Sequence, residues 1–509
     1  MNENSRIANT SKNVITSLIN QIITLILAFV SRTIFIRYLG VEYLGINSLF
    51  ANVLQVLSMA DLGFGTAIVY SMYKPIREND HEKLAALTYF YKKAYNIIAL
   101  VVLLVGLLIV PILPYIVKMD SEIPHLTLYY VIYLMNTVVS YLCVYKSSIT
   151  IAQQKSYILN NYDSVFVIVQ NVIQILVIIY LKSFIVYLIV QVLVNLVRNV
   201  YKASVSVRMN PYIKQKIELS KDSKTEIFGN IKSMFIYKIG GVILNSTDNI
   251  LISAIVGTIY VGFYANYLMV VNAVLTFTNL VFNSMTASIG DLNADSDSEK
   301  KLLFFNRINF IAVWLFSFCG ACFLTLFQDF IQLWLGSDYL LDFKTLIVIV
   351  LNFVMPGTIR TVSLYRDTTG IFKKTKYVFF VTAVINLILS IVFGKMWGLF
   401  GILLATVLSR VSTNMWFEPF ILFKDYFKKD CLRFYFIKQI KYWFVFALIC
   451  SITYSVNFLL PSTSYLCFII KILLCVAIPN LLLVLLYHRT KEYHYILSLV
   501  GRYIKKLKK

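Results

Sequence analysis

The amino-acid sequence predicts an all-α, polytopic membrane protein with about fourteen transmembrane helices. Of its 509 residues, 59% are hydrophobic and only 14% are charged, whereas soluble proteins carry roughly 25% charged residues. The apolar residues also come in runs of about 20, the length that a helix needs to cross the hydrocarbon core. Length alone would suggest about three soluble domains, but a soluble chain this apolar could not cover its surface.

The apolar runs define the expected helices in chain order. Each run is long enough to cross a bilayer, and polar or charged residues separate it from the next. The expected spans are 13–36, 41–70, 84–110, 124–145, 162–181, 183–207, 229–256, 258–288, 302–327, 343–363, 376–394, 397–423, 440–460 and 463–487.

The positions of the basic residues predict the orientation. With the N-terminus in the cytoplasm, and with residues toward the ends of spans counted with the adjoining loop, 38 of the 47 Lys and Arg are assigned to inward segments and 7 to outward segments, which leaves Lys238 and Arg410. This alternation follows the positive-inside rule, so both termini are predicted to be cytoplasmic. The net charge of +22 therefore reflects topology and contact with anionic lipid headgroups, and nucleic acid is not an expected partner.

The chain offers little that predicts an enzyme, a metal site or a cofactor. Cys319 and Cys322 form a C-x-x-C inside an apolar run without nearby His, which favours small buried hydrophobes over a redox pair. The acidic run 291–299 resembles the start of a calcium loop, but Leu302 stands where the loop needs Glu. The outer loops are also too short to hold the catalytic groups of a glycosyltransferase or polymerase.

Two lobes are predicted from an internal repeat. Gly40–Gly45 and Gly257–Gly262 both read G-x-x-Y-apolar-G at outer helix-to-helix turns, 217 residues apart. Arg198 and Arg410 lie 212 residues apart within the sixth helix of each half. Six spans return the chain to its starting side, so the repeats should be parallel and related by an axis along the membrane normal.

The repeat sets the expected domain boundaries. The N-terminal lobe covers 1–207 with spans one to six, and the C-terminal lobe covers 229–423 with spans seven to twelve. Residues 424–509 hold two further helices and a basic cytoplasmic tail. The linker 208–228 mixes charge with spaced apolar residues, which fits an interfacial amphipathic helix; an ordinary solvated linker is the alternative.

Three segments resemble a known family. They are Ala60–Pro75, Ser246–Asn266 and Thr369–Lys374, which are similar to parts of the bacterial oligosaccharide flippases often called Wzx. These belong to the MOP superfamily, which also holds MurJ and the MATE exporters. The resemblance implies translocation of an undecaprenyl-diphosphate-linked oligosaccharide to the outer leaflet of the bacterial plasma membrane, for cell-surface polysaccharide biosynthesis. It also implies a polymerase and glycosyltransferases as pathway partners.

Charges inside the spans are the candidate site residues. A charged side chain at the centre of a bilayer costs roughly 2.5–3.5 kcal/mol on insertion scales, so each one requires a reason. Cations facing a central cavity would form charge-assisted hydrogen bonds with a diphosphate. The candidate substrate-binding residues are Arg410, Lys238, Arg198, Arg32 and Arg37.

The alternative is that these cations form structural pairs. Asp61 and Asp248 are the expected gate or charge partners, and the repeat places Arg32 opposite Asn249, next to Asp248. Arg360 and Glu418 are interpreted as side chains that reach the membrane interface. The rival functions are a cation-coupled multidrug exporter of the same fold, which would favour acidic cavity residues, and a membrane glycosyltransferase or polymerase.

Overall fold

The computed structural model describes residues 3–61, 64–118, 123–293, 298–369, 371–427, 430–461 and 464–498. Within these ranges the regular structure is helical and no strand is present, which confirms the all-α prediction. The chain divides into two compact units, Met1–Gly262 and Phe263–Lys509, and each is described by itself.

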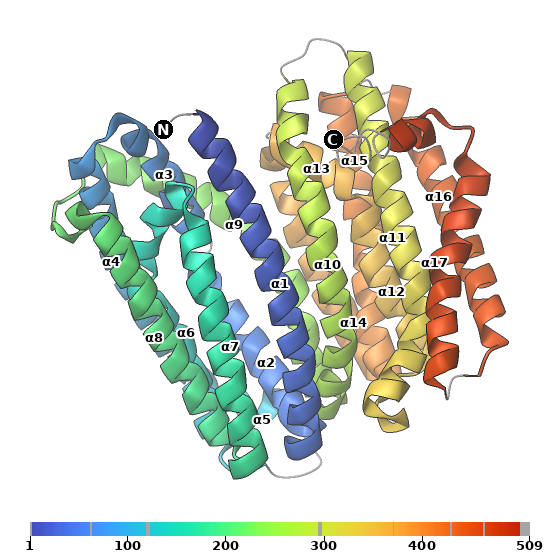
Figure 1. Cartoon of the computed structure of the whole chain (residues 1–509), viewed down its shortest axis with the longest axis horizontal. Coiled ribbons are helices and arrows are strands. Elements are labelled where there is room, and N and C mark those ends of the chain that lie inside the picture. Colours follow the sequence, from blue (N-terminus) through green and yellow to red (C-terminus); the bar gives the residue numbers. More distant parts are fainter. Residues whose placement is uncertain are drawn as a thin grey trace. The chain divides into compact units, whose positions relative to one another are not determined.

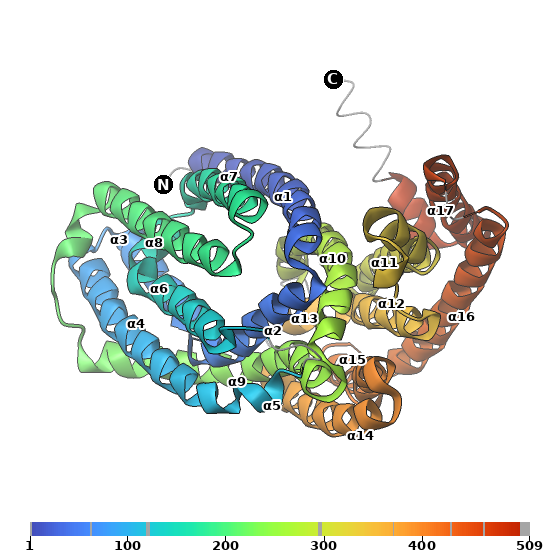
Figure 2. The same cartoon turned by 90° about the horizontal axis from the view of Figure 1, so that it is seen from below.

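The first unit is a bundle of long helices in which α6 packs against α4 and α8, and α1 lies along α7 (Figures 1 and 2). Side-chain caps begin several helices: Asp80 accepts from the Lys83 N–H at 2.9 Å and starts α4, and Ser183 starts α8 in the same way. The elements are α1 Glu3–Leu39, α2 Val41–Leu57, η1 Ser58–Asp61, α3 Phe64–Glu78, α4 His81–Ile109, η2 Val110–Ile112, α5 Leu113–Ile116, α6 Leu126–Ala152, α7 Ser156–Leu181, α8 Phe184–Met209, η3 Pro211–Lys214, α9 Lys221–Leu251 and η4 Ile252–Val256.

The second unit is built around α11, which packs against α12, α13, α16 and α17. Trp314 of α11 donates its indole N–H to Asn480 of α17 at 2.9 Å, so the last two helices are tied to this core. The elements are α10 Thr258–Asn293, whose first turn lies in the first unit, α11 Ser298–Leu335, η5 Ser337–Tyr339, α12 Phe343–Thr358, α13 Arg360–Thr369, α14 Phe372–Ser412, α15 Asn414–Asp425, α16 Asp430–Phe458 and α17 Tyr465–Tyr487.

The described part of the chain contains ten helices that are long and apolar enough to cross a membrane, or eleven if α12 and α13 form one bent span. The predicted count of fourteen is therefore not confirmed. The stretch Tyr377–Asp425 counts once although it is 49 residues long. A straight helix of that length would measure roughly 74 Å against a core of roughly 30 Å. It turns at Gly398 (φ 60°, ψ −137°), where the sequence predicts a boundary between two spans.

Two further segments depart from the expected pattern. The predicted span 41–70 is two shorter helices, α2 and α3, separated by η1. The predicted linker 208–228 contains the 3₁₀ turn η3, an extended stretch, and the start of α9 at Lys221, capped by Ser220. Helix α9 packs against α2 and α3, so the compact division places it in the first unit. The predicted lobe boundaries remain a prediction.

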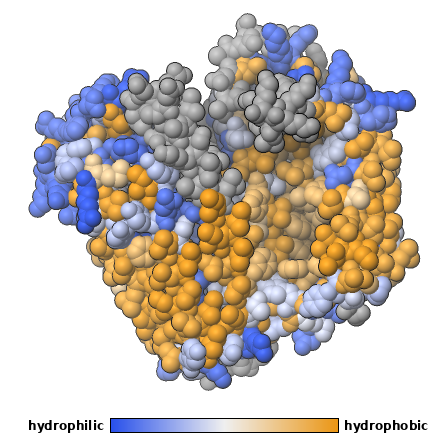
Figure 3. All heavy atoms as spheres, viewed as in Figure 1, coloured by the Kyte–Doolittle hydropathy of each residue, from blue (hydrophilic) through white to orange (hydrophobic). Residues whose placement is uncertain are grey.

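Apolar side chains cover the surfaces that a bilayer would contact (Figure 3). In the first unit they extend over α7 and α8, and hydrophilic side chains gather at the end where α3 and α4 meet. In the second unit α17 exposes one apolar residue after another along its length. The exposed residues include Val165, Ile168, Val172 and Leu176 of α7, and Leu466, Ile469, Leu473, Val476 and Leu485 of α17. This is the pattern of a multi-pass membrane protein.

Candidate functional site

Arg198 lies in a polar cluster between α7 and α8 of the first unit. Its Nη2 donates to Asn195 Oδ1 at 2.8 Å, and its Nε is 3.9 Å from the carboxylate of Asp163. Lys202, one turn further along α8, donates to both oxygens of Asp163 at 3.0 and 2.7 Å. The spacing of four residues brings both cations to one face of the helix. One carboxylate thus faces two cations, and these three side chains together carry a net positive charge.

The cluster continues into α6. The Asn195 amide donates to the backbone oxygen and the side-chain oxygen of Asn136, at 3.2 and 2.9 Å. A cavity of about 180 Å³, lined in part by Asn199 and Lys202, lies beside it. The cations are only partly buried, with 29% of the Arg198 side chain exposed and 19% of Lys202, so both remain accessible to a small ligand.

Arg410 has a related environment in the second unit. Its Nη1 donates to the backbone oxygen and the side-chain oxygen of Asn352 in α12, at 3.1 and 3.4 Å. Asn352 in turn donates to the Leu403 carbonyl at 3.0 Å. Asn352 follows Asn136 by 216 residues, nearly the offset that separates the two arginines. An arginine of the sixth predicted helix therefore lies near an asparagine of the fourth in each half.

The two copies of the G-x-x-Y-apolar-G motif contact each other within the first unit. A Cβ on Gly45 would come closer than 3.0 Å to the carbonyl oxygen of Thr258, and a Cβ on Gly262 would come as close to that of Val41. Under the offset of 217, Thr258 corresponds to Val41 and Gly262 to Gly45, so the contact is reciprocal. Such a contact is expected if the two predicted repeats meet across a pseudo-two-fold axis.

The first glycine of each motif copy allows these turns. Gly40 has φ 90° and Gly257 has φ 145°, which side chains with a Cβ rarely adopt. Each ends one helix and lets the next begin immediately. The first turns of α2 and α10 can then approach closely, because Gly45 and Gly262 lie at the contact.

The remaining predicted residues lie apart from the Arg198 cluster. Arg32 is partly buried in α1 and interacts electrostatically with Tyr187 of α8, whereas Arg37 is exposed in the last turn of α1. Asp61 ends η1 and forms a hydrogen bond with Tyr95.

Two predicted residues belong to α9. Asp248 is partly buried in that helix. Lys238 belongs to the same helix, but its side chain lies outside the described residues. Their predicted roles remain predictions, as do those of Arg198, Arg410, Arg32, Arg37 and Asp61.

The interpretation of Glu418 as an interfacial side chain is wrong. Only 1% of its side chain is exposed, and both carboxylate oxygens accept from Arg366 Nη1 at 2.9 Å. The break between α12 and α13 lets α13 pack against α15, which brings the two residues together. Arg360, at the start of α13, donates to Asn283 at 3.1 Å.

The sequence also left three charged residues of the second unit unassigned. Arg366 is the buried partner of Glu418, and Lys471 of α17 forms a buried ion pair with Asp329 of α11. A carboxylate within an apolar run is the signal that could have indicated each pair. Cys322, of the C-x-x-C, donates its thiol to the Cys475 carbonyl at 3.6 Å, and the acidic run 291–299 lies partly outside the described residues.

Comparison with known proteins identifies the family of the chain and solved structures with a similar fold. A family model described as "Polysaccharide biosynthesis protein" matches residues 10–288, more than half of the chain. The solved structure "Lipid II flippase MurJ, inward closed conformation" is 16% identical, with a TM-score of 0.65, and the match covers 93% of this chain and 98% of that one. An inward-facing MATE multidrug transporter of the MOP superfamily is 13% identical, with a TM-score of 0.62 and coverage of 76% and 92%. No curated protein matches.

Proposed function

Because the chain belongs to the polysaccharide biosynthesis protein family, we propose that it is a flippase for undecaprenyl-diphosphate-linked oligosaccharide repeat units. It would move them from the inner to the outer leaflet of the bacterial plasma membrane, where a polymerase takes them over. The polyprenyl tail stays in the bilayer while the polar head crosses between the lobes by alternating access. The MurJ-like fold supports this assignment at the level of architecture.

The observation that carries the proposal is the paired placement of Arg198 and Arg410. Each lies on the sixth predicted helix of its half and is linked to an asparagine of the fourth, Arg198 through Asn195. The surplus positive charge at Arg198, Lys202 and Asp163 suits a diphosphate, because hydrogen bonds between charged groups are roughly twice as strong as neutral ones. An inside-negative potential adds about 2.3 kcal/mol per charge per 100 mV in favour of outward movement of an anion.

The alternative of a cation-coupled drug exporter shares the fold. It would use membrane-embedded carboxylates to bind cationic drugs, but Asp163, Asp329 and Glu418 each contact Lys or Arg already. A carboxylate engaged in this way is a poor receptor for an organic cation. These three carboxylates therefore do not support binding of a cationic substrate.

Reconstitution in vesicles tests the proposal. Protein-containing vesicles receive a fluorescent, short-chain polyprenyl diphosphate sugar, and an impermeant quencher reports how much substrate remains in the outer leaflet. We expect the protein to expose the inner-leaflet pool to the quencher, with no effect on a fluorescent cationic drug. Transport of the drug without movement of the lipid-linked sugar would establish the exporter instead.

The proposed direction of transport requires the predicted orientation. Reporter fusions at Lys118 and Lys395 should be external, and fusions at Lys221 and Lys429 cytoplasmic. The reason is the strong bias of Lys and Arg toward one set of connections. A fusion reporting the opposite side would overturn the topology of that half.

A further inference from the structure

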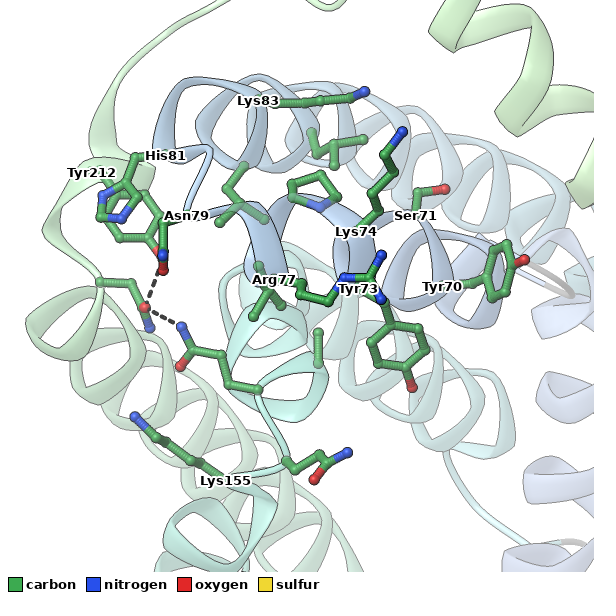
Figure 4. Close-up of a pocket in the computed structure, with 18 of the residues that line it drawn as sticks. Tyr70, Ser71, Tyr73, Lys74, Arg77, Asn79, His81, Lys83, Lys155 and Tyr212 are labelled. Carbon is green, nitrogen blue, oxygen red and sulfur yellow. Dashed lines mark hydrogen bonds between the residues drawn. The ribbon is translucent and has the colours of Figure 1, made fainter. Parts of the chain in front are cut away.

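A large cavity lies at one end of the first unit, and its lining does not include Arg198, Lys202 or Asp163 (Figure 4). Its volume is about 1020 Å³, and ligand pockets range over roughly 300–1,000 Å³. Its walls come from the end of α3 and the start of α4, from the α6–α7 turn, and from the connection between α8 and α9. These are the three predicted cytoplasmic connections of the first unit, so the cavity should face the cytoplasmic side.

The lining of this cavity is cationic. Lys74, Arg77, Lys83 and Lys155 contribute to it from both sides, and none of the described residues that line it is Asp or Glu. Glu78 comes within 4.0 Å of Lys74, but both side chains are largely exposed, and such pairs contribute little. The cavity therefore attracts anions.

The carboxylate of the α8–α9 connection, Glu218, pairs with lysines that do not line the cavity. Glu218 forms ion pairs with Lys93 and Lys224. The hydrogen bond from Lys93 holds the pKa of Glu218 below its ordinary value. These pairs are exposed and contribute little, and neither Glu218 nor its two lysines lines the cavity.

One wall of the cavity is fixed by hydrogen bonds. Asn210, which is 2% exposed, accepts from the Gln153 amide at 2.7 Å and from the Tyr212 hydroxyl at 2.9 Å. The Tyr212 ring lies 4.2 Å from the imidazole of His81, and Figure 4 shows the two side by side. These contacts join the α6–α7 turn, the α8–α9 connection and the start of α4, so the cavity has a built wall before any ligand arrives.

Two tyrosines add exposed aromatic rings to the opposite part of the cavity. Tyr70 and Tyr73 of α3 are 67% and 50% exposed, with ring centroids 6.3 Å apart. An exposed phenol ring offers an apolar face together with a hydroxyl group. Sugars present both C–H faces and hydroxyls, so these rings suit a saccharide next to a phosphate.

We propose that this cavity binds the phosphate-bearing head of a lipid-linked saccharide at the cytoplasmic surface, before translocation. The proposal rests on the proposed function for the identity of the ligand. The chemistry it requires is phosphate oxygens beside Arg77, Lys83 and Lys155, with sugar against Tyr70 and Tyr73. Phosphate oxygens could come from the lipid-linked diphosphate or from an anionic phospholipid, and the experiment separates the two.

Binding is measured on the full chain in nanodiscs of neutral phosphatidylcholine. One arm titrates a farnesyl diphosphate-linked N-acetylglucosamine, and the other raises the fraction of phosphatidylglycerol in the disc. We expect Arg77→Gln and Lys155→Gln each to weaken binding of the sugar probe about three- to tenfold, because each removes a charged hydrogen-bond donor. Tyr73→Ala should weaken the sugar probe but leave binding of inorganic pyrophosphate unchanged.

Lys92→Gln is the matched control. Lys92 is an exposed cation of α4 that does not line the cavity, and the substitution removes the same charge. It should stay within about twofold of the wild type, since exposed charges at a distance are screened. Equal weakening by Lys92→Gln and Arg77→Gln would overturn the proposal, because the effect would then be one of net charge.

The two lipid arms identify the source of the phosphate. If Arg77→Gln and Lys155→Gln weaken binding of the sugar probe in discs of neutral lipid, the result supports the lipid-linked diphosphate as the ligand. Variants that alter only the response to phosphatidylglycerol would overturn the saccharide assignment in favour of a phospholipid headgroup. Because binding is measured without transport, a wild-type protein that binds but does not translocate would contradict the proposed function and leave the cavity assignment intact.

Discussion

The two compact units differ in how deeply they bury their ion pairs. In the second unit the Arg366–Glu418 pair has side-chain exposures of 5% and 1%. In the first unit the Lys202–Asp163 pair has exposures of 19% and 30%. The buried pair of the second unit is thus compensated within the protein, whereas the pair of the first unit keeps access to the surroundings.

This difference in exposure distinguishes charges that stabilise the fold from charges that can bind a ligand. Removing one partner of a buried ion pair costs roughly 3–5 kcal/mol, because the other charge stays buried and uncompensated. An ion pair in contact with solvent contributes about 0–1 kcal/mol, so a ligand can replace one partner at little loss. The comparison therefore predicts that removing one charge of a buried ion pair destabilises the second unit, whereas removing a cation of the partly exposed pair weakens ligand contacts in the first.

Breaking the Arg366–Glu418 pair should have the largest effect. Arg366→Met leaves the Glu418 carboxylate buried without its arginine, and we expect the free energy of unfolding to fall by about 3–5 kcal/mol. Unfolding by SDS in mixed micelles measures it. The double variant Arg366→Met/Glu418→Met should recover most of the loss, because two apolar side chains need no compensation. A single variant as stable as the wild type would show that the second unit does not depend on this pair.

Adding a methyl group at the close contact of Gly262 should cause the next largest loss of stability. Gly262→Ala places a methyl group against the Val41 carbonyl, and such overpacking typically costs about 1–3 kcal/mol. Gly241→Ala is the control, because nothing lies within 4 Å of a Cβ there. Replacing that helical glycine should stabilise α9 by roughly 0.5–1 kcal/mol. Similar unfolding midpoints for both variants would argue against a tight contact at Gly262.

Neutral replacements of Arg198 and Arg410 test the comparison by the rate of transport. Arg410→Gln should lower the initial rate of translocation in vesicles about tenfold, the loss of one charged hydrogen bond to the substrate. Arg198→Gln should lower it about threefold, because Lys202 retains a charge in that cluster. Both variants should reach wild-type levels in the membrane. A larger loss for Arg198→Gln than for Arg410→Gln would show that the cluster around Arg198 makes the stronger contact with the substrate.

The sequence predicted the helical architecture because hydropathy and basic residues along a single chain report membrane spans directly. It predicted the turns at Gly40 and Gly257 because a positive φ favours glycine. It did not predict that Glu418 pairs with Arg366, since that contact depends on how α13 breaks from α12 and packs on α15. Nor did it predict the cationic cavity, whose walls come from three connections that are distant in sequence.

The smallest expected effect concerns a latch between Arg32 and Asp248, which remains a prediction. The reciprocal contact of Gly45 with Thr258 and of Gly262 with Val41 brings the α1–α2 and α9–α10 turns together. Arg32 and Asp248 precede these turns by eight and nine residues, so they should lie at similar depth. A partly hydrated ion pair there contributes roughly 0–1 kcal/mol, weak enough for a substrate diphosphate to compete for the arginine.

A double-mutant cycle on transport tests the latch with Arg32→Ala, Asp248→Ala and the pair. If the residues interact, the combined loss should differ from the sum of the single losses, and exchanging the two charges should restore much of the rate. The pair Arg37→Ala and Asp248→Ala is the control, because Arg37 is exposed at the end of α1. Additive losses for Arg32 and Asp248 would rule out the latch. Arg32 would then act on the substrate or on a lipid headgroup by itself, as the partly exposed cations of the first unit are predicted to do.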